Sequence, residues 1–320
     1  MHLLIFLQII NILFLVRDPD ELFTTSDTEH YVITAETVTL DETDEGRVSH
    51  LIGNVTITHG KTIITGDEGY AYEIQQMAEV QRNVRIDDEA TIITAAHAKY
   101  FKNERMAVLT DSVELRDGKQ LLKTDSLVYF KTRKFSEGYG NVVLIDKERN
   151  TEVKGNYGEY DFVDDAGFIT DNPELILFEK AKKITVSGDT LRIKRKENFM
   201  SCKGNVKLKE DSITATAGYL EYFSDSGRMY LNEKPFIEQS DKSTLSGSSI
   251  EVFLKNREIT KTVAMNDANG KYQLSNGATN NVQGDTISIL FEDGKTARII
   301  VVGNTNGLYR KVSEGEKKSE

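Results

Sequence analysis

Few side chains in this sequence have the type and spacing that catalysis or metal binding requires. The chain contains five histidines, namely His2, His30, His50, His59 and His97. No two of them share the spacing of metal ligands, and the single cysteine, Cys202, excludes an internal disulfide and a cysteine-based metal site. A glycine-rich phosphate loop and a nucleophile motif are also missing from the sequence. The residues alone therefore point to no catalytic site, and we expect no metal and no cofactor.

Two of the histidines and four aspartates need a local interpretation. We expect His59 to be a solvated turn residue and His97 to pack at the surface or at a corner. The aspartates recur at equivalent positions of a repeat and are Asp67, Asp125, Asp189 and Asp285. Aligned along the fold, they could bind cations. Asp also favours turns and bulges, because its carboxylate bonds nearby backbone groups, and we prefer that structural interpretation.

The charges argue against one class of partner. The chain has 40 Lys+Arg and 51 Asp+Glu, which gives a net charge of −11. Nucleic-acid binding draws most of its affinity from cations on phosphates, so we predict no nucleic-acid partner. Two cationic groups alternate with apolar residues: Lys180, Lys182 and Lys183, and then Arg192, Lys194, Arg195 and Lys196. Such alternation is typical of a solvated strand face, and contact with an anionic lipid headgroup is the alternative.

A short phrase that recurs about every thirty residues is the strongest pattern in the sequence. Its copies begin with Gly53-Asn54-Val55, Arg82-Asn83-Val84, Asp111-Ser112-Val113, Gly140-Asn141-Val142, Asp171-Asn172-Pro173 and Gly204-Asn205-Val206. Successive copies start 29, 29, 29, 31 and 33 positions apart, and a weaker copy begins near Glu233. The repetition predicts one continuous domain over residues 28–310, built from about eight similar units.

A second phrase follows each copy, and its spacing indicates how the strands run. An apolar residue at position p is followed by small or apolar residues at p+5 and p+7. The sets are Ile64/Gly69/Ala71, Ile93/Ala98/Tyr100, Leu122/Leu127/Tyr129, Val153/Gly158/Tyr160, Val186/Leu191/Ile193, Ala215/Leu220/Tyr222, Leu245/Ile250/Val252 and Val282/Ile287/Ile289. Residues two apart on a strand share a face, so p should face away from p+5 and p+7. A bulge or corner at the residues between them, such as Gly66-Asp67, restores one common face.

These bent strands define the fold class. Turn residues separate the phrases, no stretch shows sustained helical periodicity, and strand-favouring residues recur throughout. We predict an all-β, elongated antiparallel meander whose strands bend from one sheet into a facing sheet. Pro173 and Pro235 fall beside the valine position of the first phrase, where a corner already interrupts pairing.

The inward positions of the two sheets define the candidate site. A partly open interior would leave an apolar trough, and each acyl CH₂ moved from water into it gains about 0.8 kcal/mol. The tyrosine column Tyr100, Tyr129, Tyr160 and Tyr222 is read as core or as trough lining. The predicted lining residues are Val55, Ile57, Ile64, Val84, Ile86, Ile93, Tyr100, Val113, Leu115, Leu122, Leu127, Tyr129, Val142, Leu144, Val153, Tyr160, Val186, Leu191, Ile193, Val206, Leu208, Leu220, Tyr222, Ile250 and Val252.

The repeated Gly-Asn-Val-x-Ile, followed by Ile-x-x-Gly-Asp and an aromatic residue near the strand end, resembles the OstA-like (LptA) family. The resemblance covers roughly residues 30–310. It implies a semi-open, V-shaped β-jellyroll that carries lipopolysaccharide across the periplasm, with acyl chains inside and sugars outside. It also implies that the protein is not an enzyme and has no catalytic residues, because members of this family transport and do not catalyse. It also implies edge-strand pairing with an inner-membrane LptC-like partner and an outer-membrane LptD-like partner, and head-to-tail self-association.

The chain termini suggest export. Leu3 to Val16 is an apolar run shorter than the roughly 20 residues of a spanning helix. We expect residues 1–20 to be a signal peptide, with a short membrane anchor and a buried core segment as alternatives. Residues 311–320 are expected to form a disordered charged tail.

Other functions remain open from sequence alone. The chain could be an anchored LptC-like component of the same transport system. From other classes, it could be a surface β-solenoid enzyme or carbohydrate binder, or a structural rod with a dry interior.

Overall fold

The computed structural model describes residues 32–310, apart from residues 45, 60–61, 89–90, 119, 131, 148–149, 180–181, 211–212, 256–257, 274–277 and 293–294. The expected leader and charged tail lie outside these residues. The described chain divides into two compact units. The N-terminal unit comprises the described residues up to Pro173 and residues Ile193–Lys196, and the C-terminal unit comprises Glu174–Arg192 and the described residues from Glu197 onward.

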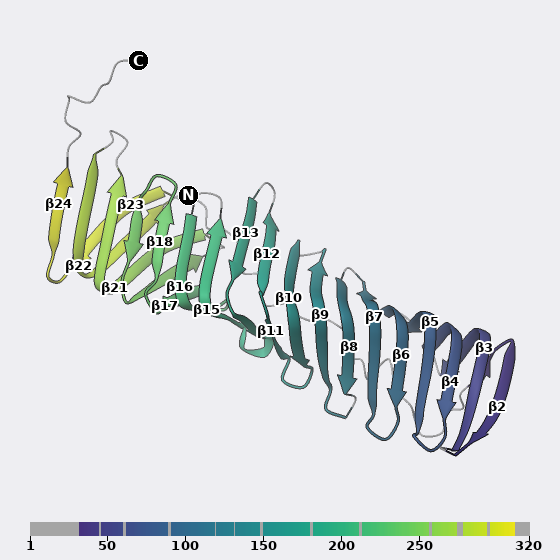
Figure 1. The fold of residues 1–320 in the computed structure, drawn as a ribbon. Coiled ribbons are helices and arrows are strands. Elements are labelled where there is room, and N and C mark those ends of the chain that lie inside the picture. The colour runs from purple at the N-terminus through teal and green to yellow at the C-terminus, as the bar shows by residue number, and fades with distance from the viewer. Residues whose placement is uncertain are drawn as a thin grey trace. The chain divides into compact units, whose positions relative to one another are not determined.

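The N-terminal unit is an antiparallel meander (Figure 1). Its strands are β1 (Val32–Thr34), β2 (Thr37–Thr43), β3 (Gly46–His59), β4 (Thr62–Tyr72), β5 (Met77–Asp88), β6 (Thr91–Phe101), β7 (Met106–Asp117), β8 (Gln120–Phe130), β9 (Phe135–Asp146), β10 (Thr151–Asp161) and β11 (Ala166–Thr170). From β2 to β11 each strand pairs antiparallel with the next one. Strand β1 pairs with the second half of β3. This order confirms the predicted meander.

The C-terminal unit is built in the same way. Its strands are β12 (Glu174–Glu179), β13 (Lys182–Ser187), β15 (Phe199–Glu210), β16 (Ile213–Phe223), β17 (Arg228–Asn232), β18 (Phe236–Gln239), β19 (Thr244–Ser246), β20 (Ser249–Lys255), β21 (Glu258–Gln273), β22 (Thr279–Glu292), β23 (Lys295–Val302) and β24 (Asn306–Arg310). Strand β14 (Thr190–Lys194) and the 3-10 turn η3 (Arg195–Glu197) contain residues of both units. Long strands pair with two short ones: β16 with β17 and β18, and β22 with β23 and β24. No described segment is a helix long and apolar enough to cross a membrane.

The long strands bend at the first phrase of the repeat. Pairing shifts register there, for example between Ile52 and Val55 in β3 and between Gln81 and Val84 in β5. Two successive residues at each bend have positive φ, as in Gly140 (73°) and Asn141 (47°). Gly and Asn tolerate this left-handed conformation best, which explains why Gly-Asn opens several copies. The predicted bulge is thus confirmed, and the left-handed residues that produce it lie in the first phrase.

Two of the three prolines, Pro173 and Pro235, mark bends where the strand is fully interrupted. Asp171 and Asn172 precede Pro173 with positive φ, between strands β11 and β12. Glu233 and Lys234 do the same before Pro235, between β17 and β18. Because proline has no N–H to donate, it fits where pairing is already broken. The expected corners at the prolines are confirmed.

The bend divides each unit into two sheets. Sheet A holds the strand parts that carry the Val-x-Ile of the first phrase, and sheet B holds the other arms. The arms meet at their inner sides: a Cβ added to Gly69 of sheet B would lie 3.4 Å from Val55 Cγ1 of sheet A. All three positions of the sets that begin at Leu122, Val153, Ala215 and Leu245 are buried. The inference that p, p+5 and p+7 face one interior is therefore confirmed for these sets.

Candidate functional site

The candidate site is the apolar interior between sheets A and B. In sheet A of the N-terminal unit, nine aliphatic residues are direct partners across successive strands. The row runs Ile33, Ile57, Ile64, Ile86, Ile93, Leu115, Leu122, Leu144 and Val153. Direct cross-strand pairs bring Cβ atoms to about 5 Å, so the side chains form a continuous apolar surface. An unbroken apolar lining is what a long acyl chain requires.

In the opposite wall, in sheet B, tyrosines alternate with small residues from Tyr100 onward. One row runs Leu40, Ser49, Ala71, Ala78, Tyr100, Ala107, Tyr129, Ser136, Tyr160 and Gly167. The tyrosine column predicted from sequence is therefore real for Tyr100, Tyr129 and Tyr160, each separated from the next by a small residue. Tyr222 lies in the C-terminal unit, in a row with Met200 and Met229.

Exposure along the interior is graded. Of the 25 predicted lining residues, all are buried except Ile57, Ile64 and Tyr100, which are half-buried. At the β1–β2 end, the inward residues Val38 and Leu40 are 55 % and 65 % exposed. In β10, Val153 and Tyr160 are 0 % and 2 % exposed. The interior of the N-terminal unit is thus accessible at its first strands and filled by its own side chains farther along.

The interior of the C-terminal unit is filled as well. Its sheet B row runs Cys202, Leu220, Leu231, Ile250, Ala264, Ile287 and Val301. Cys202 and Leu220 are both 0 % exposed, and burial raises the pKa of the Cys202 thiol to about 12. The sequence reasoning missed Cys202, Leu231 and Met200 as interior residues. The available signal was their spacing from the first phrase: Cys202 and Leu231 lie two residues before a copy, and Met200 lies four residues before one.

A polar cluster closes the interior beside β10. The Tyr160 hydroxyl donates to the Asp165 carboxylate, and Arg195 Nη1 lies 3.4 Å from both of these groups. Burial, together with this hydrogen bond, raises the pKa of Tyr160. The neighbouring Phe162 ring packs edge-on against Tyr160 and Tyr129, at centroid distances of 4.9 and 6.2 Å. This cluster fixes the turn after β10 against the apolar wall.

The corner aspartates have structural partners. Asn83 Nδ2 donates to Asp67 at 2.8 Å, Asn205 donates to Asp189 at 3.0 Å, and Asn304 donates to Asp285 at 3.0 Å. Among the described residues, no group of three or more His, Cys, Asp or Glu side chains could hold a metal ion. The structural interpretation of these aspartates therefore fits, and sequence reasoning missed the asparagines as their partners.

The remaining chemistry-bearing residues lie on outer faces. His97 Nδ1 is 3.0 Å from Asp111 Oδ2 at a corner, which is where packing was expected. His50 stacks on Tyr70 with centroids 4.3 Å apart, and both contact the Glu68 carboxylate at 2.6 Å. These hydrogen bonds lower the pKa of Glu68. The side chain of His59 lies outside the described part of the chain.

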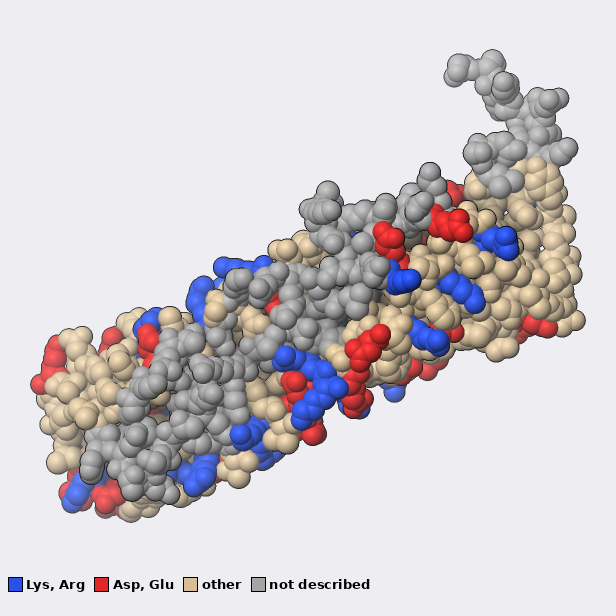
Figure 2. Space-filling model, turned by 180° about the vertical axis from the view of Figure 1, so that it is seen from behind, with Lys and Arg blue, Asp and Glu red and all other residues tan. Residues whose placement is uncertain are grey.

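The two cationic groups of the sequence have different environments. In the second group, Arg195 pairs with Asp165 and Lys196 Nζ donates to the Val163 carbonyl at 2.5 Å. In the first group, only the side chain of Lys183 is described, and it is exposed. On the face drawn in Figure 2, basic side chains lie among acidic ones over much of the described surface.

Comparison with known proteins gives a family match for part of the chain. Residues 27–165 match the family model described as OstA-like protein. Among solved structures, the chain is similar to LptH from Pseudomonas aeruginosa, described as the LptA homologous periplasmic component of the conserved lipopolysaccharide transport device. The identity is 17 %, the TM-score is 0.31, and the match covers 35 % of this chain and 82 % of that one. A search of curated proteins found no match.

Proposed function

We propose that this chain, in which residues 27–165 match the family model described as OstA-like protein, carries lipopolysaccharide through the periplasm without catalysing a reaction. The acyl chains occupy the interior between sheets A and B, and the sugars stay outside. In this role the protein is one component of a bridge between the inner and outer membranes. The 25 lining residues named from the sequence are the proposed contacts of the acyl chains.

The observation that carries the proposal is the continuous aliphatic row from Ile33 to Val153. Each acyl CH₂ that leaves water for such a surface gains about 0.8 kcal/mol. A twelve-carbon chain therefore gains on the order of 10 kcal/mol, before the cost of making room for it. An isolated pocket offers no such path, whereas a row of paired side chains allows the lipid to move from strand to strand.

The graded exposure suggests where a lipid first binds. The interior is accessible near β1 and β2 and filled near β10, where Val153 and Tyr160 are almost fully buried. A lipid would bind first at the accessible strands. Further movement requires sheets A and B to separate, because the side chains that fill the interior have to give way.

The proposed partners bind at terminal strands. Strands β2 and β23 expose apolar residues, including Leu40 (65 %), Ile300 (40 %) and Val302 (58 %). Exposed apolar edges are normally avoided, and pairing with another chain's strand covers them. LptC-like and LptD-like jellyroll domains, or a second copy of this chain, are the proposed partners.

A structural rod is the second candidate, and the filled interior of the C-terminal unit favours it. An LptC-like anchored component stays an alternative within the first proposal. A parallel β-solenoid does not fit, since the strand pairs described here are antiparallel.

A pair of adjacent isoleucines tests the proposal. Ile64 faces the interior and is half-buried, whereas Ile63 faces outward and is 43 % exposed. A photocrosslinking residue is placed at each position in the full chain in cells. We expect lipopolysaccharide adducts at position 64 and none at position 63. Equal labelling at both positions, or none at position 64 while the protein is folded, contradicts a lipid-bearing interior and leaves the rod.

A further inference from the structure

The outer face of sheet A in the C-terminal unit differs in charge from the rest of the chain. Lys207 and Lys209 on β15 are paired in register with Ser187 and Thr185 on β13, and Lys183 lies on the same face two residues before Thr185. All three lysines are exposed. They form a group only because β13 pairs with β15, so their proximity cannot be read from sequence order.

These lysines have no acidic partner among the described residues. The two acidic residues of this face are Glu174, which pairs in register with Ser187, and Glu238, which lies 3.5 Å from Lys242. A fourth exposed lysine, Lys271, lies farther along the face on β21. The face is therefore net positive on a chain whose net charge is −11.

The equivalent outer face in the N-terminal unit shows the contrast. There, Arg85 pairs with Asp87 at 2.5 Å, and Arg116 pairs with Glu114 at 2.6 Å. Two lysines on the same face are also paired, Lys123 with Glu114 and Lys154 with Glu152. Cations that are paired in one unit and unpaired in the other indicate that the C-terminal face is available to an external anion.

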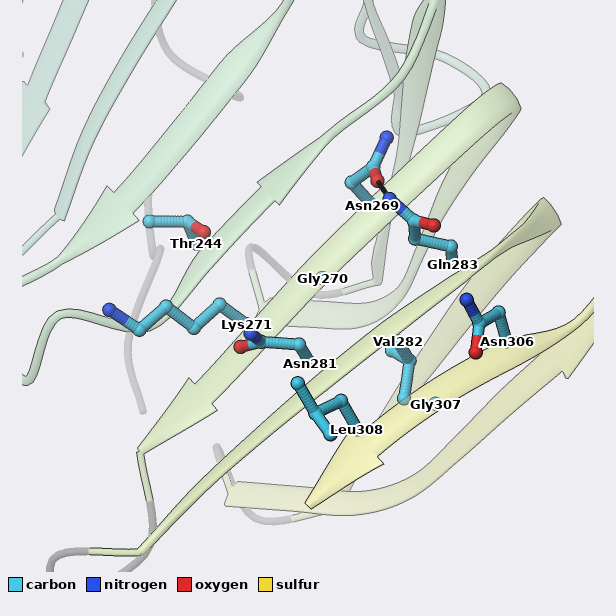
Figure 3. A pocket seen from close by; sticks show the side chains of 10 residues that line it. All are labelled: Thr244, Asn269, Gly270, Lys271, Asn281, Val282, Gln283, Asn306, Gly307 and Leu308. Carbon is cyan, nitrogen blue, oxygen red and sulfur yellow. Dashed lines mark hydrogen bonds between the residues drawn. The ribbon is translucent and has the colours of Figure 1, made fainter. Parts of the chain in front are cut away.

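The same face carries a polar hollow of about 360 Å³ (Figure 3). It crosses strands β19, β21, β22 and β24, and its lining residues are Thr244, Asn269, Gly270, Lys271, Asn281, Val282, Gln283, Asn306, Gly307 and Leu308. Four of them are amide side chains, which both donate and accept hydrogen bonds, as sugar hydroxyl groups require. Gly270, Val282 and Gly307 are direct partners in the pairing and share the inward row of Leu245, so they meet this outer face with their backbone.

We propose that this outer face binds a phosphate-bearing oligosaccharide. The unpaired lysines hold the phosphate groups, and the amide-lined hollow holds the sugar rings. A flat anionic membrane would also attract the lysines, but a flat surface does not fit into a concave, amide-lined hollow. If the oligosaccharide is the sugar part of the carried glycolipid, the inference deepens the proposed function. The binding itself does not require lipid in the interior.

The test uses soluble, deacylated lipopolysaccharide oligosaccharide and the full chain. Binding is measured by calorimetry for the wild type and for a triple variant, Lys183→Gln with Lys207→Gln and Lys209→Gln. The matched control is Arg85→Gln with Lys123→Gln and Lys154→Gln, which changes the net charge equally. We expect the first variant to weaken binding by about tenfold or more, because it loses charge-assisted contacts to phosphate, and the control to stay within about twofold.

Two further measurements complete the test. Asn281→Ala with Asn306→Ala should weaken binding without changing its salt dependence, and phosphatase treatment of the oligosaccharide should abolish the effect of the lysine variant. No saturable binding, or equal loss in both triple variants, overturns the inference. Binding to phosphatidylglycerol vesicles but not to the oligosaccharide would assign the face to a membrane surface instead. Crosslinking at Ile64 tests lipid binding in the interior independently of oligosaccharide binding on the outer face. Either proposal can therefore fail without the other.

Discussion

Asn141 donates a hydrogen bond of 2.9 Å from Nδ2 to Asp125 Oδ2 on the neighbouring strand, and both residues lie at the bends of β9 and β8. The equivalent pair Asn83–Asp67 forms the same hydrogen bond, at 2.8 Å, two repeats earlier. The two recurring phrases of the sequence are therefore two halves of one contact. One phrase supplies the left-handed residues of the bend, and the other supplies the carboxylate that holds the asparagine.

The first prediction concerns the glycine of this contact. Gly140 has φ 73°, and an added Cβ would collide with the Asp125 carboxylate. Gly118 also has positive φ (54°), but an added Cβ would meet nothing within 4 Å. We expect Gly118→Ala to lower the free energy of unfolding by about 1 kcal/mol and Gly140→Ala by about 2–4 kcal/mol. Urea denaturation of both variants measures the difference, and equal losses would show that the carboxylate moves away freely.

The second prediction concerns the pH dependence of stability. Burial raises the pKa of Cys202 from 9.0 to about 12. Between these values the unfolded chain loses the thiol proton and the folded chain keeps it, so stability falls as pH rises. The contribution is about 1.4 kcal/mol per pH unit.

Comparison with Cys202→Ala isolates this contribution. We expect the wild type to lose stability more steeply than the variant between pH 9 and pH 11, measured by denaturation at each pH. The native thiol should also resist a maleimide reagent until denaturant is added. Identical slopes in the two proteins would mean that the thiol is accessible in the folded state.

The third prediction concerns the cluster beside β10. Tyr160→Phe removes the hydroxyl that donates to Asp165 and accepts from Arg195. It leaves the Asp165–Arg195 pair intact, so we expect a loss of about 1–2 kcal/mol. Asp165→Ala should cost more, because it leaves the Arg195 guanidinium without its carboxylate. In the double variant the two losses should not add, since both residues share one network. The control is Tyr157→Phe, which removes a hydrogen bond to Glu159 on the outer face. Additive losses of stability for the Tyr160 and Asp165 variants would contradict a shared network.

The fourth prediction concerns association at the terminal strands. Leu40 and Thr39 are adjacent and exposed on opposite faces of β2, and Leu40 lies on the inward face. If chains associate through this end, Leu40→Asp should shift sedimentation toward the monomer, while Thr39→Asp keeps the wild-type distribution. A wild type that stays monomeric at all concentrations would refute self-association.

Much of the fold could be predicted because the residue spacing within each repeat indicates where the strands bend. The odd spacing from Leu122 to Leu127 and Tyr129 requires an extra residue in the strand, and the register shift appears at Lys123–Ser126 as that spacing demands. The row of lining residues followed from the same argument. Its lipid-binding role stays a prediction, because burial of Val153 or Leu220 is equally compatible with a dry core.

Other features depend on partners that lie far apart in the sequence. The Asn205–Asp189 hydrogen bond joins neighbouring strands of the C-terminal unit, and neither residue alone indicates it. Likewise, Lys183 and Lys209 share a face only because β14 is skipped in the pairing of β13 with β15. The division into two units near Pro173 was not anticipated, since the repeat continues through it with only slightly longer spacing.

The bends also determine how each unit can deform. Left-handed residue pairs recur on every second long strand of the N-terminal unit, and Asn–Asp hydrogen bonds join two of these bends to the neighbouring strand. Stiffness is therefore concentrated at the bends. The interior should therefore widen by a hinge motion about the bends, in which the far edges of sheets A and B move apart. A bulky ligand would enter between these far edges. A crosslink between the two opposing edges should block ligand binding while leaving the fold unchanged.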